Sequence, residues 1–258
     1  MRVKIHNKED FASMHKAGAL AAKTLDYINP QVVPGVTTEH LNKLCHEFII
    51  SNNAIPAPLN YKGFPKSICT SINHVVCHGI PSERQLKNGD IVNIDVTVIL
   101  DGWYGDTSRM FFVGDVSIKA KRLTQVTHDA LMKAISIIKP GVTLGDIGYI
   151  IQKHAENYNY SVVRDYTGHG IGRVFHDDPV VLHYGNPGEG LKLKENMFFT
   201  IEPMLNAGKH NTLLSKDGWT VFSRDKSLSA QFEHSIGVTK NGCEIFTLSP
   251  QNIFYPSE

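Results

Sequence analysis

Apolar residues recur at helical spacing in two stretches near the start of the chain. They fall three or four positions apart over residues 11–28, and this pattern ends at the Asn-Pro pair at 29–30. A second apolar stripe follows the Pro-Gly pair at 34–35 and stops at the Ser-Asn-Asn of residues 51–53. Because proline and glycine punctuate helix ends, each stretch predicts one amphipathic helix.

The same periodicity predicts two helices further along the chain. One covers about residues 119–139, with the Pro-Gly pair at 140–141 as its stop. The other begins at Thr143, and Asp146 three positions later completes a pair that resembles a capping box. The remaining sequence is mostly typical of strands and loops.

Residues 91–113 alternate around an Asp-Gly pair at 101–102, which predicts a β-hairpin with a two-residue turn. One face of its first strand is wholly aliphatic, whereas Asp95 lies mid-strand on the other face. Pairing around this turn places Asp106 opposite Thr97 and diagonal to Asp95, roughly 7 to 8 Å away at the backbone. The two carboxylates are then close enough to share a ligand.

Two motifs are repeated in the same order along the chain. PGVTTEHL recurs 106 residues later as PGVTLGDI, and LKNGDIVNID, ending at Asp95, recurs 107 residues later as LKENMFFTIE, ending at Glu202. The repeat predicts a duplicated α+β half, with halves at about residues 1–118 and 119–258 packed as one domain and the functional site at their seam. The alternative is that Pro-Gly-Val-Thr is simply a common helix entry.

Asp95 and Asp106 would repel each other in a half-buried site unless a cation compensated them. Glu202 stands at the repeat position of Asp95, and Glu233 follows on the strand-like segment SAQFEHSIGVT. Four carboxylates and a histidine suit two hard or borderline cations, which predicts a dinuclear metal hydrolase. For any one acid alone an ordinary ion pair is the alternative, for example between Arg109 and Asp106.

Among the 13 histidines, His78 and His169 each precede Gly-Ile, one in each half. Glycine beside an imidazole allows close approach of backbone and substrate, which makes both candidate site residues. The glycines around His169 do not form a G-x-G-x-x-G motif between a strand and a helix, which argues against nucleotide binding. His176 can either reach the same site or pair with the acids at 177–178.

Composition places the chain among globular proteins, with 258 residues and 41% hydrophobic residues. Its 26 basic and 25 acidic residues give a net charge of +1, which argues against direct nucleic-acid binding. No apolar run approaches the roughly 20 residues of a membrane span, and the first residues are too charged for a signal peptide. We therefore expect a cytoplasmic monomer with no membrane partner.

Five motifs taken in order resemble the type I, bacterial-like methionine aminopeptidases: VVCHGIP, VNIDVTVILDGWYGDTSRMF, TGHGIGRVFH, FTIEP and QFEHSIGVT. The resemblance extends over essentially the whole chain. It implies the pita-bread α+β fold, in which two pseudo-symmetric halves form one domain. It also implies hydrolysis of the initiator methionine from nascent proteins with a small second residue, which makes methionyl peptides the substrate and the ribosome surface a candidate partner.

The resemblance also implies a ligand set and a cofactor. The implied metal ligands are Asp95, Asp106, His169, Glu202 and Glu233. Asp106 and Glu233 would bridge two divalent ions, with Fe²⁺, Mn²⁺ or Co²⁺ expected and Zn²⁺ compatible. The ions would activate a shared water and, together with His176, stabilise the oxyanion, while Glu202 would carry the proton to the leaving amine. His78 would contact the peptide beyond the scissile bond.

A pocket for the methionine side chain is implied as well. Its lining would be Tyr61, Phe64, Cys69, Phe175 and Trp219. These apolar and polarisable side chains suit a thioether, although each of them alone is more often a plain core residue. Pro58 replaces the Cys, and Phe64 the Tyr, that many bacterial members carry.

Three alternatives share this fold. Prolidases and aminopeptidase P usually carry a large additional N-terminal domain, whereas here the first predicted helix begins almost at once. The type II methionine enzyme has an inserted helical subdomain, for which the spacing from His169 to Glu233 leaves no room. A catalytically inactive binding protein would have lost metal ligands, and all five are present.

Overall fold

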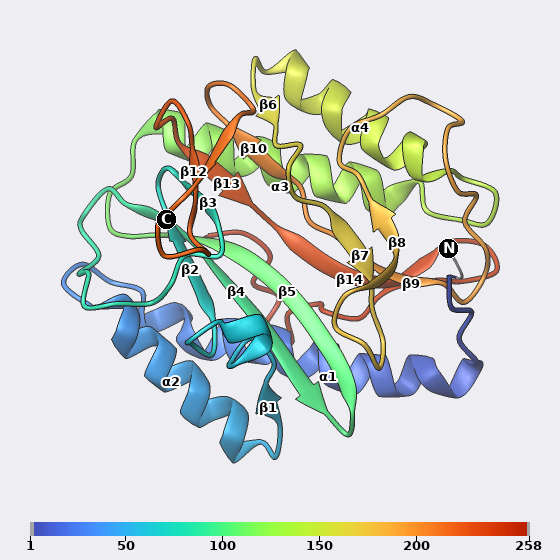
Figure 1. Cartoon of the computed structure of the whole chain (residues 1–258), viewed down its shortest axis with the longest axis horizontal. Coiled ribbons are helices and arrows are strands. Elements are labelled where there is room, and N and C mark those ends of the chain that lie inside the picture. The colour runs from blue at the N-terminus through green and yellow to red at the C-terminus, as the bar shows by residue number, and fades with distance from the viewer. Residues whose placement is uncertain (1–2, 257–258) are drawn as a thin grey trace.

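Figure 1 shows the computed structural model, which describes residues 3–256. The α-helices of this part of the chain are α1 (Lys8–Ile28), α2 (Thr38–Ser51), α3 (Ile118–Ser136) and α4 (Leu144–Asn157). The short 3₁₀ turns are η1 (Asn29–Gln31) and η2 (Tyr61–Gly63). None of the described helices is both long enough and apolar enough to cross a lipid bilayer.

All four predicted helices are present, and the predicted capping box is confirmed. The Thr143 side chain accepts from the Asp146 backbone N–H, while the Asp146 carboxylate accepts from the Thr143 backbone N–H. Only the end of α3 differs, because the helix stops at Ser136 rather than near residue 139. Its last turn tightens into i→i+3 bonds, and the residue before Pro140 is disfavoured in the α conformation.

Strands make up most of the remaining structure. Their bounds are β1 (Ile55–Pro56), β2 (Cys69–Ile72), β3 (Val75–Cys77), β4 (Ile91–Leu100), β5 (Trp103–Phe112), β6 (Ser161–Val162), β7 (Gly168–Gly170), β8 (Asp177–Val181), β9 (Phe198–Ile201), β10 (Met204–Asn206), β11 (Thr212–Leu214), β12 (Val221–Ser223), β13 (Ser229–Gln231), β14 (Glu233–Val238) and β15 (Cys243–Ile245). The predicted strand-like segment SAQFEHSIGVT is divided between β13 and β14.

A nine-stranded antiparallel sheet forms the centre of the molecule. Its main path runs β1-β4-β5-β14-β9-β7-β8, with β2 on β4 and β15 on β14. The late strand β14 lies between β5 of the first half and β9 of the second. In Figure 1 the α1–α2 pair lies on one side of these strands and the α3–α4 pair on the other.

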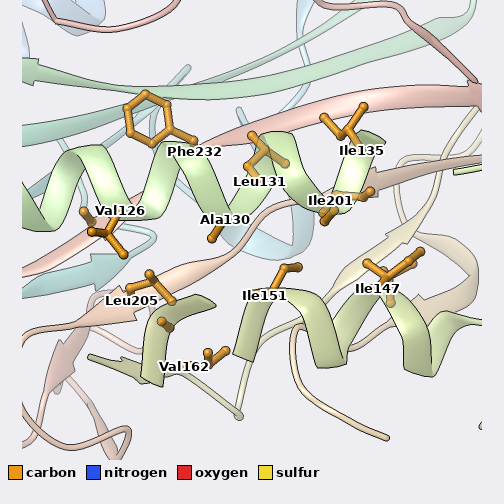
Figure 2. Close-up of a cluster of buried hydrophobic side chains, with 14 of the residues drawn as sticks. Val126, Ala130, Leu131, Ile135, Ile147, Ile151, Val162, Ile201, Leu205 and Phe232 are labelled. Carbon is orange, nitrogen blue, oxygen red and sulfur yellow. The ribbon is translucent and has the colours of Figure 1, made fainter. Parts of the chain in front are cut away.

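Each helix pair covers its own hydrophobic core. The aliphatic face of β4, predicted from its alternation, packs with buried residues of α1 and α2 such as Leu25 and Leu41. The second core lies between α3, α4 and the strands of the second half, as Figure 2 shows for Leu131, Ile151 and Ile201. Because the aliphatic face of β4 packs in the first of these two cores, Asp95 lies on the opposite face of the strand.

The two sequence repeats make equivalent backbone contacts. Gly35 N–H donates to the Leu86 carbonyl, and Gly141 N–H donates to the Leu193 carbonyl, at 2.8 and 3.0 Å. Isolated bridges join Thr37 to Gln85 and Thr143 to Lys192 at the same offsets. These matched contacts support our proposal that residues 1–118 and 119–258 are duplicated halves of one domain.

The packing of β5 against α1 depends on a glycine. A Cβ at Gly105 would lie 2.3 Å from the backbone carbon and oxygen of Ala17, whereas a Cβ at Gly242 would meet nothing closer than 3.9 Å. We expect Gly105→Ala to lower the free energy of unfolding by about 3 kcal/mol because backbone must move, and Gly242→Ala to leave it nearly unchanged. Urea denaturation of both variants measures this, and equal stabilities would contradict the close approach.

Candidate active site

A cavity of about 320 Å³ gathers every side chain that the sequence singled out for chemistry or substrate binding. These residues are Tyr61, Phe64, Cys69, His78, Asp95, Asp106, His169, Phe175, His176, Glu202, Trp219 and Glu233. Pro58, Lys62 and Thr97 complete its lining. The cavity lies along the face of the central sheet that the helices leave free.

The β4–β5 hairpin places the first two carboxylates as predicted. Asp101 and Gly102 form the turn, both with positive φ (52° and 76°), as a two-residue hairpin turn of the I′ kind requires. The resulting register pairs Thr97 with Asp106 and Asp95 with Ser108. Asp95 and Asp106 therefore share one face of the sheet.

Five adjacent strands each contribute one ionisable side chain to this face. In sheet order the strands are β4, β5, β14, β9 and β7, and the corresponding side chains are Asp95, Asp106, Glu233, Glu202 and His169. Ser108 is paired with Asp95 on one side and with Glu233 on the other, which aligns these acids across three strands. Glu202 stands directly after β9.

The charges in this cluster strongly oppose one another. Burial raises the pKa values of Asp95 and Glu233 well above their usual range, and the neighbouring carboxylates raise them further. Burial also raises the pKa of Glu202, to about 7. Although burial lowers the pKa of His169, Asp106 and Glu202 raise it to about 9. The protein pays for burying these acids unless positive charge joins them.

The donor set fits divalent metal. Ligand atoms of Asp106, His169 and Glu233 all lie within 4.8 Å of one another, and the buried Oδ1 of Asp95 has no hydrogen-bond partner. His169 Nε2 is 3.5 Å from Asp106 Oδ2 and 3.6 Å from Glu202 Oε1, so no short ion pair consumes these atoms. Carboxylate oxygens with one imidazole suit ions such as Mn²⁺, Fe²⁺ or Co²⁺.

The alternative pairing of Arg109 with Asp106 is wrong. Arg109 NH1 bonds Asp26 Oδ1 at 3.0 Å, and Ser249 donates to the same buried carboxylate. Arg109 on β5 is paired with Ile94 on β4, and Ile94 faces the aliphatic core. The Arg109 side chain therefore points away from Asp106. The carboxylates of the cavity therefore keep their charge available for a metal ion.

Hydrogen bonds behind the cluster orient its acids, and no sequence pattern predicts most of these bonds. Thr97 donates to Asp106 at 2.6 Å, and Thr200 donates to Glu202 at 2.7 Å. The Glu202 backbone N–H donates to Nε2 of His183, a fully buried imidazole whose pKa burial lowers to about 3. Only Thr97, which the hairpin register places opposite Asp106, could have been identified beforehand.

Aromatic side chains enclose the other end of the cavity. Phe64, Cys69 and Phe175 are buried, and Trp219 meets the Phe64 ring edge-on at 5.2 Å between centroids. Tyr61 contacts the Phe175 ring at 4.8 Å. The result is an apolar pocket directly beside the acidic cluster.

Both candidate histidines flank this pocket. His176 stacks on Phe175, and its Nδ1 lies 2.9 Å from the hydroxyl of Tyr61. It thus reaches the cavity rather than pairing with the acids at 177–178. His78 has a positive φ of 55° and packs edge-on against Tyr166 at 5.4 Å between centroids.

A buried acidic cluster with one imidazole beside an apolar pocket defines the class of metal-dependent peptidases. In agreement, residues 12–240 match the model of metallopeptidase family M24, and the chain belongs to this family. The expectation of a metal-dependent aminopeptidase is confirmed.

Comparison with individual relatives shows which metallopeptidases this chain is most similar to among those compared. Methionine aminopeptidase of Rickettsia prowazekii (strain Madrid E) is 72% identical over 257 residues, 99% of each chain. The crystal structure of methionine aminopeptidase from Rickettsia prowazekii superposes with a TM-score of 0.95 at 73% identity, covering 96% of this chain and 100% of that one. The enzyme from Thermotoga maritima superposes at 0.93 with 39% identity, covering 95% and 99%. These likenesses confirm the resemblance and the pita-bread fold inferred from the sequence.

Metal binding should stabilise the protein. Mn²⁺ supplied at about 100 times its dissociation constant is expected to add about 2.7 kcal/mol, and Asp106→Asn should remove most of this gain because it removes one charge from the cluster. Thermal unfolding of metal-free protein with and without Mn²⁺ measures both. Asp129→Asn, a partly buried position on α3 outside the cavity, is the control and should retain the gain. An equal gain in the Asp106 variant would contradict its place in the site.

Proposed function

We propose that this enzyme removes the N-terminal methionine from nascent proteins whose second residue is small, with two divalent ions as cofactors. The observation that carries the proposal is an apolar pocket beside five clustered candidate metal ligands, which lie on or directly after five adjacent strands. Identity of 72% to a methionine aminopeptidase over the whole chain supports the same substrate and favours it over the prolidase and aminopeptidase P alternatives.

The chain's own acids and one histidine would hold the ions. The proposed ligands are Asp95, Asp106, His169, Glu202 and Glu233, which all line the cavity, and Asp106 and Glu233 would be the two that serve both ions. Fe²⁺, Mn²⁺ or Co²⁺ are the proposed ions, and Zn²⁺ is compatible with the same donors. When bound, such ions lower the pKa of a water molecule and polarise the carbonyl of the scissile bond.

The apolar pocket would bind the methionine side chain and exclude water from it. Phe64, Cys69 and Phe175 provide buried walls, while Tyr61 and Trp219 close the sides. A thioether makes favourable contacts with aromatic rings, which gives this pocket its preference for methionine. The methionine side chain and the reacting peptide group would both lie in this cavity of about 320 Å³, with the second residue beside the acidic cluster.

Polar side chains around the pocket would act on the reacting peptide bond. If the Tyr61 hydroxyl donates to Nδ1 of His176, the ring proton stays on Nε2 and can stabilise the developing oxyanion. Glu202, held at Oε1 by Thr200, would move the proton to the leaving amine through Oε2. His78 would contact the peptide beyond the scissile bond.

The proposed substrate also suggests where the enzyme works. Initiator methionines are removed as chains emerge, so we propose a cytoplasmic enzyme that meets its substrate at the ribosome surface. A monomer suffices, because one chain supplies all proposed ligands and the whole pocket.

Peptide cleavage tests the proposed substrate. With Mn²⁺, Fe²⁺ or Co²⁺ supplied, the enzyme should release methionine from a Met-Ala peptide at least tenfold faster than from a Met-Lys peptide, because a long second side chain does not fit beside the pocket. Quantifying free methionine by chromatography measures the rates. Equal cleavage of both peptides, or none with any metal, would contradict the proposal.

The Tyr61–His176 bond has its own test. Tyr61→Phe keeps the ring contact with Phe175 but loses the hydroxyl, so we expect kcat on Met-Ala peptides to fall about fivefold with KM changed less than twofold. Tyr104→Phe is the matched control. Tyr104 also stacks on Phe175, at 5.4 Å, and makes no hydrogen bond to His176 among the described residues. Equal kcat in both variants would show that the bond does not position His176.

A further inference from the structure

Lys62 is a permanent positive charge in the wall of the active-site cavity. Of the described residues that line this cavity, it is the one lysine or arginine. Lys62 and His176 are both exposed and therefore mark an open end of the cavity, beside the Tyr61 and Phe175 rings that they contact. A polypeptide substrate whose first residue fills the pocket has to leave past this end.

The Lys62 side chain is free to meet a substrate. Its amine lies 5.3 Å from the centre of the Tyr61 ring, and within residues 3–256 no acidic side chain comes within 4 Å of that amine. The next lysine on the same segment, Lys66, differs because it is paired with Glu39 at 2.6 Å. Lys62 is therefore an unneutralised charge beside the reacting groups.

The backbone holds Lys62 at this place. Lys62 adopts left-handed angles (φ 47°, ψ 28°), which non-glycine residues rarely do. The turn around it is closed by bonds from Asn60 N–H to the Phe64 carbonyl at 2.8 Å and from Phe64 N–H to the Tyr61 carbonyl at 2.9 Å. The backbone of Lys62 is thus fixed at the mouth of the cavity, within reach of its side chain.

Its field reaches the catalytic groups. The Lys62 amine is 5.3 Å from the centre of the Tyr61 ring, and the hydroxyl of the same ring is 2.9 Å from Nδ1 of His176. Under the proposed function, on which this inference rests, two divalent ions neutralise the four cavity carboxylates. Lys62 then gives the mouth of the loaded site a net positive potential.

We propose that Lys62 is a specificity-determining residue, which favours substrates with an acidic residue at the third or fourth position over substrates with a basic one. Its amine attracts the carboxylate of an acidic segment as that segment leaves the cavity. The effect is modest because both charges remain in water, about threefold in kcat/KM for one charge.

Three peptides that differ only at the third residue test this preference: Met-Ala-Glu, Met-Ala-Gln and Met-Ala-Lys, each extended by the same neutral tail. We expect kcat/KM at low ionic strength to decrease in this order, with about tenfold between Glu and Lys. Because surface charges are screened, 0.5 M salt should reduce the range to less than threefold. Lys62→Gln should do the same at low salt, and Lys62→Glu should reverse the order.

Matched variants separate the charge from other effects. Lys62→Arg should keep the order, and so should Lys66→Gln, which removes a lysine from the same segment but not from the cavity. An unchanged Glu-to-Lys ratio in Lys62→Gln would overturn the inference while leaving the proposed function intact. Failure to release methionine from all three peptides with any metal would instead count against the proposed function.

Discussion

Mutual repulsion among buried carboxylates is the constraint on which the rest of the structure depends. Four acids and one imidazole crowd the free face of one sheet. Burial raises the pKa values of Asp95, Glu202 and Glu233, and neighbouring carboxylates raise those of Asp95 and Glu233 further. No fold would keep such a cluster for stability alone, since each charge costs free energy when it loses water. Cation binding explains why the cluster is kept, and the hydrogen bonds from Thr97 and Thr200 orient its acids for this purpose.

Features encoded over short stretches were predictable from the sequence. The alternation of polar and apolar residues and the Asp-Gly turn predicted the register that brings Asp106 beside Asp95. Apolar periodicity, together with the residues that begin or end helices, predicted all four helices. The ligand assignment beyond these two acids came from the repeat and from family motifs rather than from geometry. Those features share one property: each depends on residues close in the chain or on a recurring pattern.

Long-range polar contacts were not predictable in this way. Arg109 was given Asp106 as a possible partner, yet it pairs with Asp26, 83 positions away. The bond between Tyr61 and His176 joins residues 115 positions apart, and nothing in either segment indicates it. Such pairs are decided by which faces the packed halves bring together, so they follow from the tertiary structure and not from local propensity.

The position of β14 has a consequence for biosynthesis. This strand comes from near the end of the chain but is inserted between β5 and β9, and it carries Glu233. Until β14 has left the ribosome, β5 and β9 lack the strand that joins them, and the cavity lacks Glu233, one of the proposed metal ligands. A growing chain is thus catalytically inactive. It becomes active in one late step, when β14 pairs with β5 and β9.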